Sequence, residues 1–92
     1  IHPSLLPSFK GINSINDALN AGVRITGCTA HIVQKEVDSG SIICQSAVEV
    51  CDDDNYETLR KKIQINEHKI FPLAISIAAQ QWRNKPTGKK DQ

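Results

Sequence analysis

The fold is decided by the stretch Ile1-His2-Pro3-Ser4-Leu5-Leu6-Pro7, in which a histidine stands between an isoleucine and a proline. Pro3 fixes its own φ and biases His2 toward an extended conformation. The stretch therefore predicts the end of a strand that runs into a stiff loop, with His2 at the exit. Ligands bind at strand ends in open α/β sheets, and an imidazole titrates near neutral pH. His2 is thus a candidate site residue, and a loop histidine that faces water is the alternative.

A short helix is predicted after this loop. Ser14 and Asp17 have the spacing of a capping box, and Gly22 supplies the C-terminal stop. The helix has only about two turns, so tertiary packing must hold it. In the loop before it, Gly11 either supplies a positive φ, as an ordinary turn glycine does, or lets the backbone approach a ligand closely.

Two strands are predicted next, over residues 23–33 and 42–50, because both are rich in β-formers and the second ends in polar–apolar alternation. Gly27 marks a close approach or a bulge in the first strand. The polar loop at 34–40 joins the strands, and a loop of this length most simply makes them an antiparallel pair. His31 lies inside the first strand, where a half-buried histidine with a hydrogen-bond partner is the simplest interpretation.

A long helix is predicted from Asn55, with Asp54 as its cap and Glu57 completing a capping box. Apolar side chains fall near one face of it, namely Tyr56, Leu59, Ile63, Ile70, Ala74 and Ala78. Pro72 removes a hydrogen-bond donor and should kink the helix or split it in two. From pattern alone Glu67 is a surface residue.

Composition excludes several classes of function. The net charge of +1 gives no field that would favour nucleic acid, and no apolar run reaches the roughly 18 residues of a membrane span. The three cysteines are odd in number and form no C-x-x-C pair, so neither a disulfide framework nor a zinc site is predicted. Thiols in such a context favour a reducing compartment, and we expect a cytoplasmic protein.

The chain contains no methionine, so we expect it to be the C-terminal part of something larger. Residues 1–82 are assigned to that portion of a domain. Residues 83–92 are assigned to a basic, flexible tail, because they combine lysine and arginine with proline and glycine and lack interleaved aromatic residues.

Five separated motifs now stand in order: Ile1–Pro7, Lys10-Gly11, Thr26–Val33, Val37–Ile43 with Gln45, and Glu67–Pro72. Together they closely resemble the C-terminal half of the phosphoribosylglycinamide formyltransferase family. Methionyl-tRNA formyltransferase and formyltetrahydrofolate deformylase share parts of the pattern. The sequence around Ser8–Gly11 and Thr26–Thr29 is most similar to the animal form, in which the C-terminal domain of a trifunctional purine enzyme carries this activity.

The resemblance implies an α/β fold: the C-terminal part of a formyltransferase-type Rossmann-like sheet with flanking helices, incomplete without its N-terminal half. It also implies formyl transfer from 10-formyltetrahydrofolate, as cosubstrate, to the amine of glycinamide ribonucleotide in purine synthesis. Folate and glycinamide ribonucleotide are the implied partners, with other purine-pathway domains in the same polypeptide. No metal, nucleic acid or membrane is implied.

The resemblance also implies residue roles. His2 is similar to the family's general acid, and Asp38 to the aspartate that raises the pKa of that histidine. From pattern alone Asp38 is a turn residue bonded to its own backbone. Glu67 and Gly11 match substrate-binding positions. The folate-binding positions are His31, Gln34, Lys35, Glu36, Val37 and Asp38.

One departure limits the resemblance. The family places an asparagine immediately before the position of Ile1, and that residue and the glycine-rich phosphate loop lie outside these 92 residues. Two alternatives therefore stay open. The chain is a non-catalytic remnant or binding module, or it belongs to a sibling formyltransferase or deformylase with a different acceptor.

Overall fold

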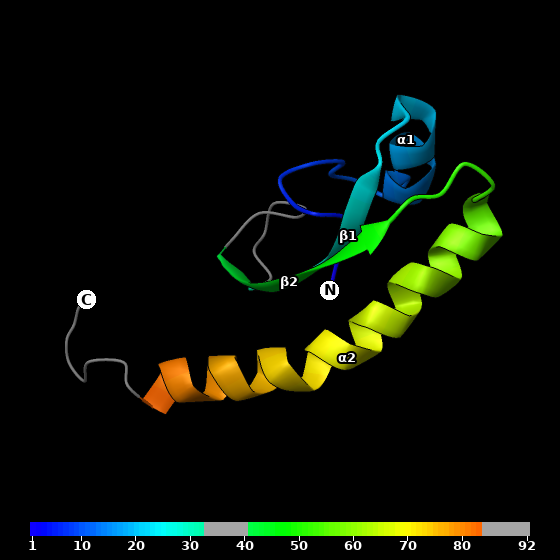
Figure 1. Cartoon of the computed structure of the whole chain (residues 1–92). Helices are drawn as coiled ribbons and strands as arrows, with labels where there is room; N and C mark the ends of the chain where they lie inside the picture. The colour runs from blue at the N-terminus through cyan, green and yellow to red at the C-terminus, as the bar shows by residue number, and fades with distance from the viewer. Residues whose placement is uncertain (33–40, 84–92) are drawn as a thin grey trace.

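The computed structural model describes residues 1–32 and 41–83. Its elements follow in the order α1 (Ser14–Ala21), β1 (Ile25–His31), β2 (Ile42–Glu49) and α2 (Tyr56–Arg83). The two strands lie between the N-terminal loop with α1 and the long helix α2 (Figure 1). Most of the predicted tail at 83–92 lies outside the described residues, so the boundary at 82 stays a prediction.

The strands form the predicted antiparallel pair, in a register that places Thr29 opposite Gln45. β1 begins two residues later than predicted, and β2 begins where predicted but ends one residue earlier. Gly27 is a point of close approach, because an added Cβ would overlap the Ser46 carbonyl oxygen and lie 2.8 Å from Leu5 Cδ2. The irregularity in the pairing falls between Ala30 and His31 instead.

The core lies between the sheet and α2. It consists of Ile15, Cys28, Ala30, Val48, Val50, Leu59, Ile63, Ile70 and Ala74. Leu59 and Ile63 are at most 1% exposed, so this helix face was predicted correctly. Tyr56, at its start, is an exception because its side chain is 41% exposed. Burying a side chain such as leucine or isoleucine contributes about 1.5–3 kcal/mol, so this seam stabilises the packing of α2.

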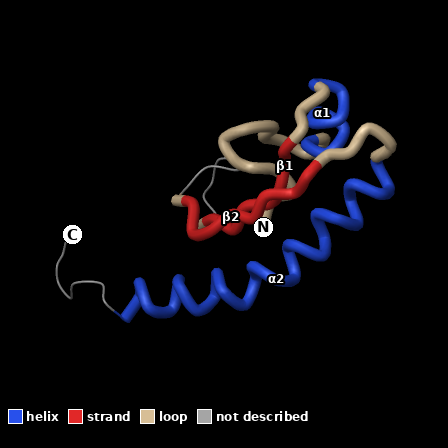
Figure 2. The backbone as a smooth tube through the Cα atoms, in the orientation of Figure 1, coloured by secondary structure: helices blue, strands red, loops and turns tan. Residues whose placement is uncertain are grey.

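Pro72 bends α2 without splitting it. The helix is continuous from Tyr56 to Arg83, and Figure 2 shows the bend in its middle. Proline deprives the preceding turn of one hydrogen bond. Ile70 and Ala74, on either side of Pro72, are both buried in the core, and this packing holds the two halves of the helix in one piece.

The predicted capping box at Ser14 is wrong. Asn13 is the N-cap and makes no side-chain capping bond, whereas Ser14 lies inside the helix. Its hydroxyl donates to the Pro3 carbonyl oxygen at 3.4 Å, and so ties α1 to the N-terminal loop. The predicted stop at Gly22 is confirmed, since its φ of 70° is left-handed and its N–H faces the last helical carbonyls.

The predicted cap of α2 is wrong by one residue. Asn55 and Thr58 form the capping box: the Thr58 N–H donates to Asn55 Oδ1 at 3.0 Å and the Asn55 N–H donates to Thr58 Oγ1 at 2.9 Å. Asp54 accepts hydrogen bonds from the Cys51 N–H, the Thr58 hydroxyl and the Lys62 ammonium, the last at 2.5 Å. Led by the bond from Lys62, these contacts lower the pKa of Asp54 from 3.8 to about 2.

Asp54 should therefore make the fold sensitive to acid. A pKa that is lower in the folded chain contributes stability above about pH 4, and that contribution is lost as the pH falls toward 2. We expect Asp54→Asn to flatten the fall in the free energy of unfolding over this range, as measured by urea titration. Asp53→Asn, at the exposed neighbouring position, is the control. Equal slopes for both variants would contradict the assignment.

Candidate active site

His2 is held at the edge of the sheet by backbone pairing with β1. Its N–H donates to the Thr29 carbonyl oxygen at 2.7 Å, and the Thr29 N–H donates back to the His2 carbonyl oxygen at 2.9 Å. This isolated antiparallel bridge adds His2 to the edge of β1. The predicted placement of His2, at a strand end leading into a loop, agrees with this geometry. The residue is only 6% exposed, so the alternative of a histidine facing water is wrong.

The imidazole of His2 is oriented by the loop that follows it. Its Nε2 lies 3.0 Å from the Phe9 carbonyl oxygen. Because a carbonyl can only accept, Nε2 carries the proton in this contact. Phe9 has a φ of 54°, in the left-handed region, and this turn aims its carbonyl back at the ring.

The Thr29 side chain clamps the same loop on the face of β1 opposite α2. Its Oγ1 donates to the Ser4 carbonyl oxygen at 2.7 Å and accepts from the Leu6 N–H at 3.0 Å. Gln45 Nε2 donates to Thr29 Oγ1 at 3.0 Å and to the Leu6 carbonyl oxygen at 2.9 Å. Thr29 is fully buried, so this hydroxyl satisfies loop groups that would otherwise lack partners.

Sequence reasoning assigned no role to Thr29 or Gln45. The available signal was the alternation of side chains between the two faces of a strand. Once the strands are paired in register, Thr29 and Gln45 both point to the face that the Pro3–Pro7 loop covers. The register itself is not visible in either strand taken alone.

Glu67 lies in the seam between α2 and the sheet, half-buried rather than on the surface as pattern alone suggested. Burial raises the pKa of its carboxyl, while the positive charges of His68 and His2 act in the opposite direction. The same carboxylate acts on Cys28. Burial, and to a smaller extent the charge of Glu67, raises the pKa of this thiol to about 11. His2 and Glu67 therefore share one electrostatic environment.

Of the remaining predicted site residues, the structure describes Gly11 and His31 but not those at 34–38. Gly11 has a φ of 100°, as predicted for one of its two readings, and follows the turn that carries Phe9. His31 is half-buried at the end of β1, with Nδ1 3.1 Å from the Ile32 carbonyl oxygen. Gln34, Lys35, Glu36, Val37 and Asp38 lie outside the described residues, so the pairing of His2 with Asp38 stays a prediction.

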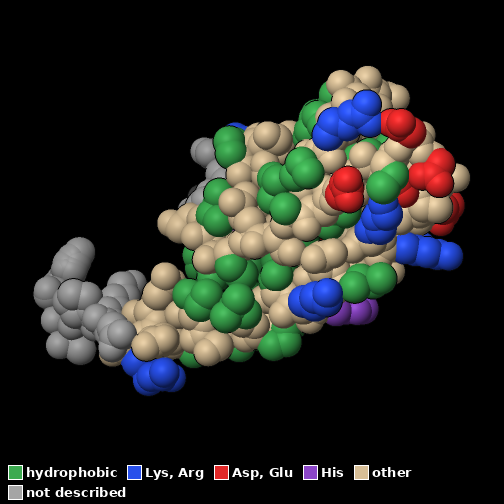
Figure 3. Space-filling view, in the orientation of Figure 1, with side chains coloured by type: hydrophobic (Ala, Val, Ile, Leu, Met, Phe, Trp, Pro, Cys, Tyr) green, Lys and Arg blue, Asp and Glu red, His purple; other side chains and the backbone are tan. Residues whose placement is uncertain are grey.

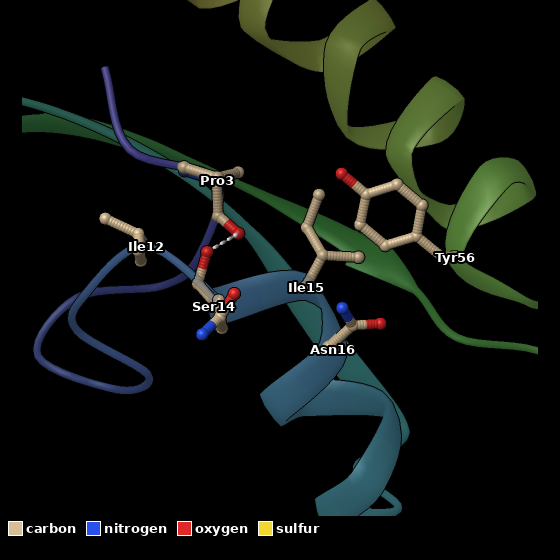
Figure 4. A pocket seen from close by; sticks show the side chains of 7 residues that line it. Pro3, Ile12, Ser14, Ile15, Asn16 and Tyr56 are labelled. Atoms are coloured by element: carbon tan, nitrogen blue, oxygen red, sulfur yellow. Dashed lines mark hydrogen bonds between the residues drawn. The ribbon is translucent and has the colours of Figure 1, made fainter.

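A cavity of about 380 Å³ lies elsewhere (Figure 4). It is lined by Pro3, Ile12, Asn13, Ser14, Ile15, Asn16 and Tyr56. Figure 4 shows the Ser14 hydroxyl turned to Pro3 and the Tyr56 ring beside Ile15. None of the predicted site residues lines it, and tyrosine is its only titratable side chain, so we do not place the chemistry there.

Within residues 1–32 and 41–83, no helix is both long and apolar enough to cross a bilayer. In the same part of the chain, no three His, Cys, Asp or Glu side chains gather closely enough to hold a metal ion.

The helices and the sheet make this an α/β protein. The buried His2 at the sheet edge and the half-buried Glu67, whose pKa the charge of His2 affects, form a candidate acid–base site. Residues 1–75 match the model of the family described as formyl transferase. The chain therefore belongs to the formyl transferase family.

Two curated relatives show how the chain compares with whole proteins. The bovine trifunctional purine biosynthetic protein adenosine-3 is 54% identical over 79 residues, which are 86% of this chain and 8% of that protein. Phosphoribosylglycinamide formyltransferase of Bacillus subtilis is 45% identical over 75 residues, which are 82% of this chain and 38% of that enzyme. The chain thus spans well under half the length of these relatives.

Solved structures confirm the predicted fold class. Glycinamide ribonucleotide transformylase 1 from Symbiobacterium toebii superposes with a TM-score of 0.83 at 48% identity, covering 86% of this chain and 37% of that one. Phosphoribosylglycinamide formyltransferase from Anaplasma phagocytophilum gives 0.82 at 41% identity, covering 98% and 46%. The resemblance read from the five motifs is confirmed.

The Thr29 clamp can be tested by removing only its hydroxyl. Thr29→Val keeps the size of the side chain but leaves a buried N–H and a buried carbonyl of the loop without their partner. We expect a loss of about 1–3 kcal/mol in the free energy of unfolding, measured by denaturant titration. Thr29→Ser, which keeps the hydroxyl, is the matched control. If Val and Ser behave alike, the hydrogen bonds do not hold the loop.

Proposed function

We propose that a polypeptide containing this chain transfers a formyl group from 10-formyltetrahydrofolate to the amine of glycinamide ribonucleotide. The observation that carries the proposal is the burial of His2 at the sheet edge, fixed by Thr29, in the electrostatic environment of Glu67. Relatives with that formyl transfer activity in their names support it, at 45% identity for the Bacillus subtilis enzyme.

His2 is the proposed general acid. As the amine attacks the formyl carbon, negative charge develops on the formyl oxygen. A positively charged imidazole aimed at that oxygen stabilises the charge and then supplies a proton. A neighbouring carboxylate favours the charged imidazole and raises its pKa, which is the role proposed for Asp38. The positive charge comes from a side chain, so the mechanism needs no metal.

Glu67 and Gly11 are the proposed contacts for glycinamide ribonucleotide. A carboxylate that is half-buried beside the sheet is paired more strongly with an amine than one in open water, because solvent screens it less. Gly11 leaves its backbone unobstructed, since nothing lies within 4 Å of the position of an added Cβ. These two features support the proposed roles of Glu67 and Gly11.

We further propose that the folate is held by His31 and by the loop residues Gln34, Lys35, Glu36, Val37 and Asp38. The two ends of that loop are tied together, because the Ile32 N–H donates to the Ser41 carbonyl oxygen at 2.9 Å. This contact supports a loop anchored at the end of β1, next to His31.

The cellular setting is also proposed. Other purine-pathway domains belong in the same polypeptide, as the trifunctional bovine relative suggests by its name. The cytoplasm is the proposed location, since Cys28, Cys44 and Cys51 all carry free thiols.

Two substitutions test the proposed roles in an intact enzyme that contains this chain. We expect His2→Ala and Asp38→Asn each to lower kcat at least about a hundredfold, the scale of a positioned acid–base group. Lys61→Ala, on an exposed position of α2, should leave kcat unchanged. The measurement is formyl transfer from 10-formyltetrahydrofolate to glycinamide ribonucleotide.

The same assay separates the alternatives. Transfer to water or to a charged tRNA, with none to glycinamide ribonucleotide, would assign the chain to a sibling enzyme. Binding of folate with no transfer to any acceptor would mean a non-catalytic module. Near-normal turnover in either variant would reject the residue roles.

A further inference from the structure

A cysteine and a lysine meet at the end of the sheet where β1 begins and β2 ends. Cys51 lies in the turn between β2 and α2, and Lys62 lies in the second turn of α2. The Lys62 Nζ is 3.5 Å from Cys51 Sγ, which is a hydrogen-bond distance for sulfur. Neither residue has a role in the proposed formyl transfer, so the pair is left to be explained.

The position of the Lys62 ammonium does not depend on the thiol. Its Nζ also donates to the Glu49 carbonyl oxygen at 3.2 Å and to Asp54 Oδ2 at 2.5 Å. An ammonium has three hydrogens, so these two acceptors and the Cys51 sulfur account for all of them. Two partners on the strand end and the turn therefore hold the nitrogen beside the sulfur.

The thiol of Cys51 is open to small solutes. Cys51 is exposed, whereas Cys28 is buried in the core. A cavity of about 260 Å³ opens beside it, with Arg24, Asp52 and Asp54 also in the lining. Figure 3 shows acidic and basic side chains gathered at this end of the molecule, where α2 begins. A small polar oxidant such as hydrogen peroxide can therefore reach the sulfur.

We propose that hydrogen peroxide joins Cys51 and Lys62 through a reversible S–N bond. The Cys51 thiolate attacks one peroxide oxygen and the O–O bond breaks, which gives a sulfenic acid and, after protonation, water. The lone pair of the neutral Lys62 amine then attacks the sulfur, and the S–O bond breaks to release a second water. A thiol, an amine and one peroxide thus give a sulfenamide and two waters, and the two electrons lost by sulfur reduce the peroxide.

Asp54 restrains this cross-link. Its bond to Lys62 raises the pKa of the ammonium, so less of the amine is neutral and able to attack. Arg24 and Asp52, which line the same cavity, pair with each other. The second step should therefore be faster at higher pH, and faster again when the Asp54 carboxylate is removed. Once linked, the nitrogen carries no charge and Asp54 loses its ion pair.

Peptide mapping tests the proposal in an intact enzyme that contains this chain. After treatment with hydrogen peroxide at about pH 8 and digestion with trypsin, we expect peptides 36–60 and 62–69 to be joined. Their mass should be two hydrogens below the sum of the two peptides, and a thiol reductant should separate them. A disulfide cannot give this product, because 62–69 contains no cysteine. Lys62→Arg is the matched control, since it keeps the cation but a guanidinium stays protonated and forms no link.

Two further arms make the test decisive. Asp54→Asn should speed the cross-linking at least about threefold at the same pH, whereas Asp53→Asn should leave its rate unchanged. Unfolding in urea before oxidation should abolish the link, because the fold brings the two atoms together. Oxidation of Cys51 to a sulfinic acid with no joined peptides would overturn the proposal. So would a link that persists in Lys62→Arg through Lys61, or one that forms equally in the unfolded chain.

Discussion

Two backbone hydrogen bonds between His2 and Thr29 determine where everything else at the candidate site can lie. They place a histidine from the first loop beside the middle of β1, which is itself fixed by its pairing with β2. The Thr29 side chain then holds the loop that follows, through Ser4 and Leu6. One residue thus fixes both the position of His2 and the path of the chain after it.

The two faces of β1 contact different surroundings, one apolar and one polar. Cys28 and Ala30 point toward α2 and belong to the apolar core. Thr29, between them, points to the opposite face, where its neighbours are polar groups of the loop. This alternation lets a strand that is buried on both faces hold a polar loop without weakening the core. Glu67 lies on the core side, where burial raises the pKa of its carboxyl.

Local signals in the sequence predicted the elements well and their connections less well. The strands, their antiparallel pairing and the stop at Gly22 follow from composition and spacing, and the structure agrees. The caps failed because the side chains of Ser14 and Asp54 bond to partners outside the expected box: the Pro3 carbonyl and the Lys62 ammonium. The Thr29–Gln45 clamp could not be predicted because it depends on a register set between two strands. The roles proposed for His2 and Glu67 come from the motif resemblance and not from spacing alone.

The pairing of His2 with Thr29 is most directly tested by amide hydrogen exchange, followed by NMR. The Thr29 N–H donates to His2, so its exchange rate reports this bridge. The account predicts that the Thr29 amide exchanges at least about a hundredfold more slowly than in an unstructured peptide. Exchange within about tenfold of the unstructured rate would contradict it, because His2 would then not be held at the sheet edge.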